Sequence, residues 1–186
     1  MSLQAESYGF FDALLLFVDL ERAEEPSLAR WKADQKDDLV IQALSILYKL
    51  APAAAHHLTE LRAGAVVLQY VRVCFGPTGD AAVRLLRRMA AVPELVTELG
   101  ADGALDTALD LLGDPSIAVE VRQDAASVLT TLCTTHDANQ SLLRAAHGIP
   151  VLVRTPARLS PLCSPPSPVP KRCERVQCVS TARDLR

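Results

Sequence analysis

The chain has 186 residues, of which 49% are hydrophobic and only 4% are aromatic, enough to form one domain with a continuous core. Leu, Ala and Val dominate its apolar residues, which is typical of helices packed on helices and argues against a β-sandwich. The net charge is −3, but residues 154–186 hold seven basic and two acidic residues, so the preceding part is acidic. An acidic part with few aromatic side chains argues against nucleic-acid binding. Composition therefore predicts an all-α fold followed by a chemically different tail.

The apolar run GFFDALLLFVDL at residues 9–20 is not expected to be a targeting or membrane segment. Asp12 and Asp19 interrupt it, no basic segment precedes it, and it is too short to span a bilayer. The stretch that follows, residues 21–36, is expected to be a long loop that holds the only tryptophan, Trp31. Five cysteines are an odd number, which favours free thiols in a reducing compartment. We therefore expect a soluble protein of the cytoplasm, with the nucleus left open as a second compartment.

Three segments share one pattern of apolar residues. They lie at residues 42–51, 81–90 and 124–133 and read QALSILYKLA, AAVRLLRRMA and DAASVLTTLC. Their apolar positions are three and four residues apart, so each segment is predicted to be an amphipathic helix. Leu47, Leu86 and Leu129 occupy the equivalent inward position of the three helices.

A glycine precedes a second apolar segment after a similar interval each time. These glycines are Gly64, Gly103 and Gly148, and Gly9 fits the same place before the first segment. The pattern therefore repeats about every forty residues, a period typical of helical solenoids built from two or three helices per unit. In such a stack each unit exposes apolar surface until a neighbouring unit covers it.

The last unit, HDANQSLLRAAHGIPVLV at residues 136–153, resembles the armadillo signature. The resemblance is at the level of the family and extends over residues 4–153. It implies a right-handed armadillo-like α-solenoid of about three repeats plus a truncated fourth, with a first helix near residues 138–147. Thr155-Pro156 and the prolines after it should end the fourth repeat's second helix. We therefore expect two parts, a helical repeat domain at residues 1–153 and a disordered Pro/Ser/Arg-rich tail at residues 154–186.

An incomplete fourth repeat would expose apolar side chains that a following helix normally covers. The residues expected at this exposed terminal repeat are Leu142, Leu143, Ile149, Val151 and Leu152. A patch of this kind favours association with other proteins or with another copy of the chain. One alternative is therefore that the chain is a truncated or alternative form of a longer repeat protein, in which this surface mediates self-association or assembly.

Residues that could carry chemistry do not form a recognisable catalytic set. His56 and His57 are adjacent on a predicted helix and point about 100° apart, so a half-buried or surface role is expected rather than metal binding. Cys133 is expected to pack as a small core residue. The stretch GPTGD at residues 76–80 lacks the end of a phosphate-binding loop and is predicted to be a turn in which Asp80 caps the next helix. We therefore expect no enzymatic activity, no cofactor and no metal.

The armadillo resemblance also points to a groove formed by the third helix of each repeat. Its positions in this chain are Ser45, Lys49, Arg84, Arg88, Ser127 and Thr131. They lack the Trp and Asn side chains with which nuclear-import members hold basic peptides, and the charged ones are all basic. The resemblance therefore implies a protein-binding module or scaffold whose groove holds another protein, with an acidic extended segment as the candidate ligand. The alternative for these residues is an ordinary solvated helix face.

Overall fold

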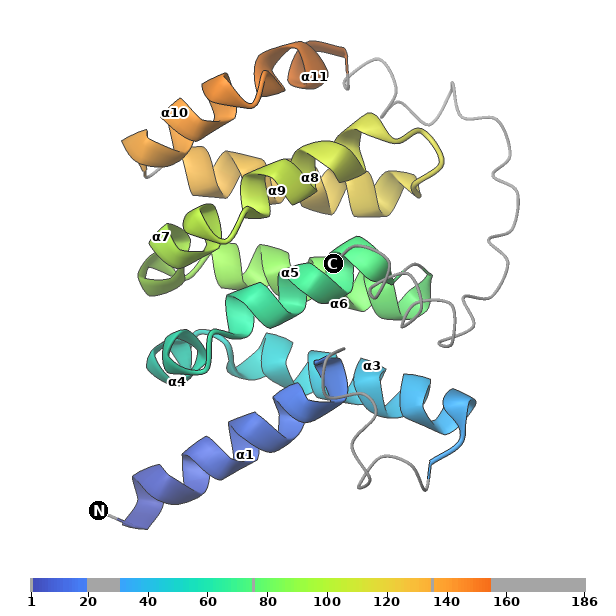
Figure 1. Ribbon diagram of the computed structural model, residues 1–186, viewed down its shortest axis with the longest axis vertical. Helices are drawn as coiled ribbons and strands as arrows, with labels where there is room; N and C mark the ends of the chain where they lie inside the picture. The colour runs from blue at the N-terminus through green and yellow to red at the C-terminus, as the bar shows by residue number, and fades with distance from the viewer. Residues whose placement is uncertain (1, 20–30, 75, 135, 155–186) are drawn as a thin grey trace, which may run out of the picture.

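The computed structural model describes residues 2–19, 31–74, 76–134 and 136–154, and over these residues the chain is all-α, with ten helices and no strand (Figure 1). The helices are α1 (Ser2–Val18), α3 (Ala33–Leu50), α4 (Ala55–Glu60), α5 (Ala63–Val73), α6 (Pro77–Ala90), α7 (Pro93–Ala101), α8 (Ala104–Gly113), α9 (Val119–Thr134), α10 (Asp137–Ala145) and α11 (Gly148–Arg154). The predicted fold class is therefore confirmed. No helix in these ranges is both long and apolar enough to cross a membrane.

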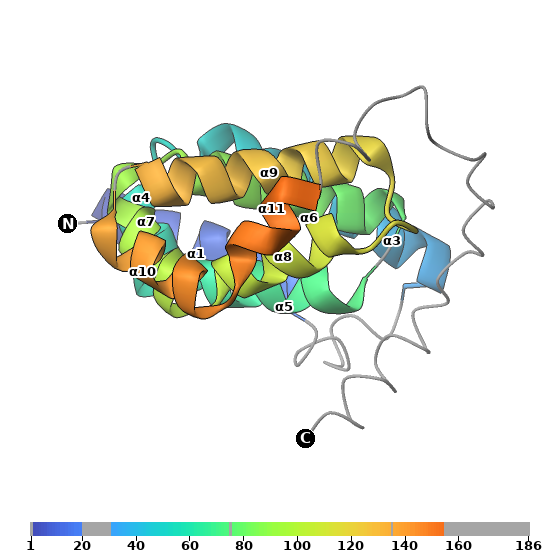
Figure 2. The same ribbon diagram turned by 90° about the horizontal axis from the view of Figure 1, so that it is seen from above.

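The helices pack in rows that follow the order of the chain. Helix α6 lies between α3 and α9, and α5 packs against α1, α6 and α8 (Figures 1 and 2). Helix α11 packs on α8, so α1, α5, α8 and α11 form a second row beside the row of α3, α6 and α9. The short helices α4, α7 and α10 lie together along one edge, where α7 contacts α4. Helices at equivalent places in the sequence pattern thus lie next to one another.

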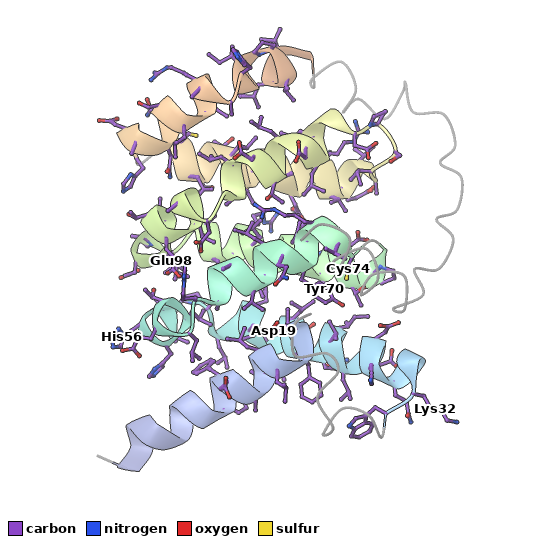
Figure 3. The ribbon with its side chains drawn as sticks, in the orientation of Figure 1. Asp19, Lys32, His56, Tyr70, Cys74 and Glu98 are labelled. Carbon is purple, nitrogen blue, oxygen red and sulfur yellow. The ribbon has the colours of Figure 1, made fainter. Side chains whose placement is uncertain are left out.

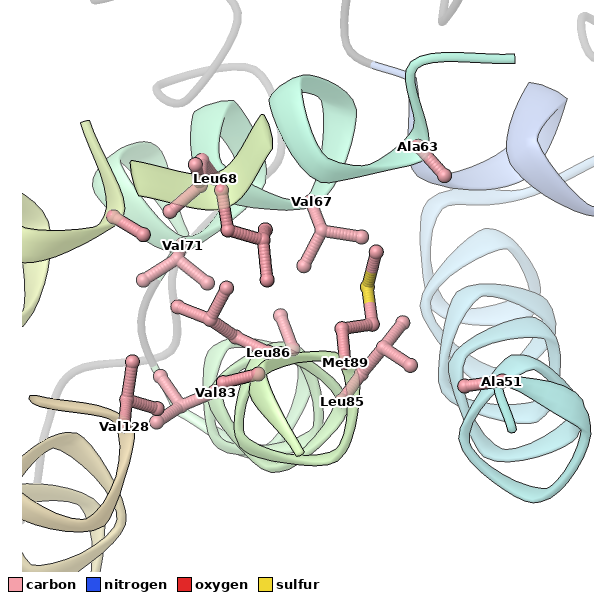
Figure 4. Close-up of a cluster of buried hydrophobic side chains, with 14 of the residues drawn as sticks. Ala51, Ala63, Val67, Leu68, Val71, Val83, Leu85, Leu86, Met89 and Val128 are labelled. Carbon is pink, nitrogen blue, oxygen red and sulfur yellow. The ribbon is translucent and has the colours of Figure 1, made fainter. Parts of the chain in front are cut away.

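One continuous hydrophobic core runs between the two rows. It begins at Phe11 on α1 and extends to Leu132 on α9. Figure 4 shows a section of it, where Val67 and Leu68 of α5 meet Leu86 of α6. The three leucines predicted to point inward are almost completely buried, with 1% exposure for Leu47, 0% for Leu86 and 2% for Leu129. The predicted helical register of these three segments is therefore confirmed.

Two helices begin earlier than the sequence pattern indicated. Helix α1 starts at Ser2, so Gly9 lies inside the helix and does not precede it. Helix α3 starts at Ala33, which shortens the loop predicted to reach residue 36. The backbone N–H of Lys32 donates to Oε1 of Gln35 (3.1 Å), and this contact satisfies a donor at the helix start. A polar helix start of this kind resembles a loop in composition, which is why the boundary was misplaced.

The three glycines that seemed equivalent in sequence occupy different places in the structure. The residue directly before α5, α8 and α11 has a left-handed backbone each time: Arg62 (φ 49°), Gly103 (φ 86°) and His147 (φ 52°). Only Gly103 is a glycine at that place, whereas Gly64 and Gly148 lie inside the helices that follow. The chain turns from a short helix into the next one through a left-handed residue, and Arg62 and His147 adopt it without the freedom of glycine. The three helices therefore start within one residue of the predicted glycines, at Ala63, Ala104 and Gly148, although the glycines do not occupy one equivalent place in the turns.

The prediction that Asp80 caps a helix was wrong. Helix α6 begins at Pro77, and Gly76 (φ 78°) is its N-cap. Proline suits the first position of a helix because its missing N–H would have no partner there and its φ is already helical. Asp80 lies in the first turn, where its backbone N–H donates to the carbonyl of Gly76 (2.9 Å). Burial raises the pKa of the Asp80 carboxyl, while the nearby Arg84 opposes that shift.

The fourth unit consists of α10 and α11 within the described residues. Helix α10 ends at Ala145, two residues before the end predicted for it, and α11 ends at Arg154. The predicted boundary between the repeat domain and the tail is at this residue. The predicted disordered tail itself, apart from Arg154, lies outside the residues that the structure describes.

Candidate functional site

The six predicted groove residues lie on three neighbouring helices in the same register. Each helix carries a pair four residues apart: Ser45 and Lys49 on α3, Arg84 and Arg88 on α6, Ser127 and Thr131 on α9. Each pair flanks its buried leucine by two residues on either side, and at about 100° per residue this places it on the opposite side of the helix from the core. Because α6 packs between α3 and α9, the six residues share one surface, which we call the outer face.

The cationic side chains of the outer face are well exposed to solvent. Lys49, Arg84 and Arg88 are all exposed. The guanidinium carbon of Arg88 lies 5.8 Å from the centroid of the Tyr48 ring on α3, within the range of a cation–π interaction. This contact holds Arg88 toward α3, the helix that also carries Lys49. The three cationic side chains of the outer face therefore belong to α3 and α6, and none belongs to α9.

Two hydroxyl groups of the outer face are already used within their own helices. The Ser45 hydroxyl donates to the carbonyl of Ile41 (2.8 Å), and the Thr131 hydroxyl donates to the carbonyl of Ser127 (2.9 Å). A hydroxyl has a single proton to donate, so these two groups can only accept a further hydrogen bond. The donors that a carboxylate would meet on this face are therefore mainly Lys49, Arg84 and Arg88.

Acidic side chains reduce the positive charge toward α9. Asp80 lies one turn before Arg84, and the pKa of Asp80 is sensitive to the Arg84 charge. Arg87 pairs with Asp124 on α9 through a 2.7 Å contact between Nη1 and Oδ1. The sequence patterns predicted no role for Tyr48, and they predicted that Asp80 caps a helix. A one-turn spacing between Asp80 and Arg84 was visible in the sequence, but the approach of Tyr48 to Arg88 depends on helix packing.

The exposed terminal repeat is only partly as predicted. Leu142 and Ile149 are exposed, at 48% and 52%. Leu143, Val151 and Leu152 are partly buried against the core, because α11 folds back onto α8 and α10. The most exposed large apolar residue is Val153 at 73%, which the sequence patterns did not single out.

The two histidines occupy the surface and half-buried positions expected for them, and their ring centroids lie 6.0 Å apart. His56 is exposed, and its Nε2 lies 3.4 Å from Oε1 of Glu60. His57 is half-buried and stacks on the ring of Phe11, with the centroids 5.5 Å apart. Within the described part of the chain, no three His, Cys, Asp or Glu residues lie close enough to hold one metal ion.

The two cysteines that the structure describes differ in burial. Cys74 is buried, whereas Cys133 packs against the core but is only half-buried, so the prediction of core packing for Cys133 is confirmed in part. Partial burial raises the pKa of the Cys133 thiol. Cys163, Cys173 and Cys178 lie outside the described residues. Cys133 is therefore a thiol at the edge of the core.

Glu98 lies on α7 where this helix meets α4 (Figure 3), and Asp102 is the residue directly after α7. Oε2 of Glu98 and Oδ2 of Asp102 are buried without a hydrogen-bond partner, while Oδ1 of Asp102 lies 3.3 Å from Nη2 of Arg62. Burial raises the pKa of Glu98, and the negative charge of Asp102 raises it further. The folded protein therefore binds the Glu98 proton more tightly than the unfolded chain does.

This pair predicts a pH-dependent gain in stability from Glu98→Gln. A raised folded-state pKa contributes stability below the unfolded pKa of glutamate, about 4.3, and this contribution is lost as the pH rises through the folded value. We therefore expect Glu98→Gln to raise the free energy of unfolding at pH 7 and to lose that advantage in acid. Urea denaturation at several pH values measures it. The control, Glu94→Gln, removes an exposed carboxylate from the same helix and should not stabilise the protein at pH 7.

A scan against models of known protein families finds no match for this chain, and a search of curated proteins finds no significant sequence match.

Proposed function

We propose that the helices form a short right-handed armadillo-like α-solenoid. In this arrangement α4, α5 and α6 form one repeat, α7, α8 and α9 form the next, and α1 with α3 and α10 with α11 belong to incomplete repeats. The left-handed residues before α5, α8 and α11 support it, as does the packing of helices at equivalent positions. The likeness of residues 136–153 to the armadillo signature supports it independently. The outer face then corresponds to the groove formed by third helices.

We propose further that the protein is a non-enzymatic interaction module or scaffold of the cytoplasm, with the nucleus as a second compartment. Its outer face binds an acidic, extended segment of another protein. The observation that carries this proposal is the shared register of Lys49, Arg84 and Arg88 on adjacent helices, together with the absence of acidic residues among the six groove positions. Arginine side chains bind carboxylates through two parallel hydrogen bonds, and the contact with Tyr48 orients Arg88 in advance.

The acidic character of residues 1–153 opposes this binding over long distances. An acidic ligand approaches slowly unless the local potential of the outer face is positive. The salt dependence of the association rate should consequently report the balance between this repulsion and the attraction by the outer face. Added salt screens both the repulsion by the whole domain and the attraction by Lys49, Arg84 and Arg88.

Reversing the arginine charges should abolish binding of an acidic ligand. The probe is a fluorescent poly-glutamate peptide, and its affinity for the wild-type chain is compared with that for Arg84→Glu/Arg88→Glu by fluorescence anisotropy. We expect the double variant to bind at least about 100-fold more weakly, because two charge-assisted contacts are replaced by repulsion. Any remaining binding should no longer weaken as salt is added, because the attraction that salt screens has been removed. The melting temperature should change little, because both arginines are exposed.

A control variant with the same net charge separates local from global effects. Lys32→Glu/Arg144→Glu changes two exposed cations outside the outer face. We expect it to weaken binding only slightly. Equal losses in both double variants would mean that net charge alone attracts the peptide, and undiminished binding by Arg84→Glu/Arg88→Glu would refute the outer face as the binding site.

A second candidate function is assembly through the end of the molecule formed by α10 and α11. Leu142, Ile149 and Val153 are exposed there by 48%, 52% and 73%. Apolar groups gathered at one end of a domain favour association with another protein surface. Failure of acidic peptides to bind the outer face would favour this second candidate function.

A further inference from the structure

The helices α3, α6 and α9 present one side to the helix before them and another side to the helix after them. Figure 4 shows this for α6, where Leu85 lies toward Ala51, the residue directly after α3, and Val83 lies toward Val128 of α9. Both α6 residues are buried, with 1% exposure for Leu85 and 3% for Val83. A helix inside the row therefore needs a neighbour on each side to complete its burial.

Among the described residues, no further helix of this row lies on the following side of α9, although α10 packs against α9 and Nε2 of Gln140 donates to the Cys133 carbonyl (2.9 Å). In the shared register, Leu44 on α3 and Val83 on α6 correspond to Ala126 on α9. The first two are 1% and 3% exposed, whereas Ala126 is only partly buried. Ala51, directly after α3, and Ala90, the last residue of α6, are both 0% exposed. The equivalent residue on α9, Cys133, is half-buried.

Helix α11 also has a side that is less completely buried than the equivalent sides of α5 and α8. Counted from the left-handed residue before each helix, Val67 on α5 and Ala108 on α8 correspond to Leu152 on α11. Val67 and Ala108 are both 0% exposed, because α6 and α9 cover them, whereas Leu152 is only partly buried. Ala126, Cys133 and Leu152 thus surround one place next to α9 and α11. In the two preceding units, α6 and α9 fill the equivalent place. We call these three residues the open face.

We propose that the open face binds an amphipathic α-helix of another polypeptide, which packs on α9 and α11 as α9 packs on α6 and α8. This inference rests on the proposed repeat arrangement and assigns the partner for the second candidate function. The occupant should carry the inward pattern that α6 and α9 share. That pattern is Ala82, Leu85, Leu86 and Met89 on α6, and Ala125, Val128, Leu129 and Leu132 on α9.

A single helix fits this position better than a second copy of the chain. Helix α3 of another copy has the right pattern, and its Ile46 is 37% exposed at the place of Leu85. However, α1 packs on α3 as α8 packs on α9, so it would accompany α3 into the site. There it would overlap α11, which already occupies the place of α8 in this unit. The packing of the first two helices therefore disfavours the copy.

The probe is a synthetic peptide of residues 77–90, which has the inward pattern and contains no cysteine. It is added to the full chain, and the rate at which Cys133 is alkylated is followed at constant pH by peptide-resolved mass spectrometry. At saturation we expect the Cys133 rate to fall at least about tenfold. The rate at the buried Cys74 should not change. A peptide carrying Leu85→Asp should give no protection.

Two variants of the chain locate the binding. Ala126→Arg places a long charged side chain on the open face and should abolish protection, whereas Ala13→Arg changes an exposed alanine on α1 at the other end of the molecule and should not. Circular dichroism melting verifies that both variants are folded. The double variant Arg84→Glu/Arg88→Glu of the chain should retain protection of Cys133. Failure of helix binding at the open face and failure of acidic-peptide binding at the outer face can therefore be told apart.

Three results would overturn the proposal. One is an unchanged Cys133 rate at peptide concentrations up to about 1 mM. Another is protection that persists in the folded Ala126→Arg variant. The third is that, without any peptide, Cys133 is alkylated as slowly as Cys74. The open face would then already be covered, by a second copy of the chain or by residues 155–186. Sedimentation velocity on the chain alone would identify the copy.

Discussion

Replacing Leu86 with alanine should lower the free energy of unfolding by about 2 to 5 kcal/mol, the range found when a buried leucine leaves a cavity. Leu86 is 0% exposed and lies on the central helix of its row, between α3 and α9 and against α5. Its side chain therefore lies inside the core. The surrounding residues are expected to fill the cavity left by the truncation only in part. Chemical denaturation followed by circular dichroism measures the change.

Leu142→Ala is the matched control for this loss. Leu142 is 48% exposed on α10, so the same truncation removes little buried surface. We expect a change of less than about 0.5 kcal/mol, as for ordinary surface sites. If Leu86→Ala were equally mild, the register of α6 and the packing of the three-helix row would be wrong.

Gly79→Ala should also be strongly destabilising, although alanine ordinarily favours a helix. Gly79 is buried in the first turn of α6, and a Cβ at this position would overlap the carbonyl oxygen of Cys74, at the end of α5. Backbone atoms cannot rotate away as a flexible side chain can, so the joint between α5 and α6 must open. We expect a loss of about 1 to 3 kcal/mol, typical of overpacking, measured by chemical denaturation.

Gly9→Ala isolates the steric part of this effect. Gly9 also lies inside a helix, but a Cβ there meets nothing within 4 Å. Alanine should stabilise α1 by up to about 1 kcal/mol through its helix propensity. A stabilising effect of Gly79→Ala as well would show that α5 and α6 are not as close as described.

The sequence pattern predicted the interior of the helices well because burial is periodic. Leu47, Leu86 and Leu129 could be placed inward from spacing alone, since a helix that buries one stripe must repeat it every three or four residues. The helix ends were less predictable. Gly64 and Gly148 marked the turns only approximately, because the left-handed residue at two of them is Arg62 or His147, and non-glycine residues in this conformation have no clear signature.

The candidate groove residues were taken from the armadillo resemblance, which is how Arg84 and Arg88 were chosen. Because such pairs are four residues apart and the helices pack in order, the pairs share one side. The approach of Tyr48 to Arg88 and the pairing of Arg87 with Asp124 join different helices. Such contacts depend on the distance and rotation between helices, and a repeat pattern does not specify these quantities. The burial of Leu152 against α8 and α10 was missed for the same reason.

The most direct test of the proposed function is a nuclear magnetic resonance titration of the isotope-labelled chain with the poly-glutamate peptide. It reports binding residue by residue, without altering the protein. We predict that the largest shifts in the amide and side-chain signals lie at Lys49, Arg84 and Arg88, with smaller ones at Ser127 toward the α9 edge. Shifts confined to α10 and α11, or no shifts at saturating peptide, would contradict the account of the outer face as the protein-binding site.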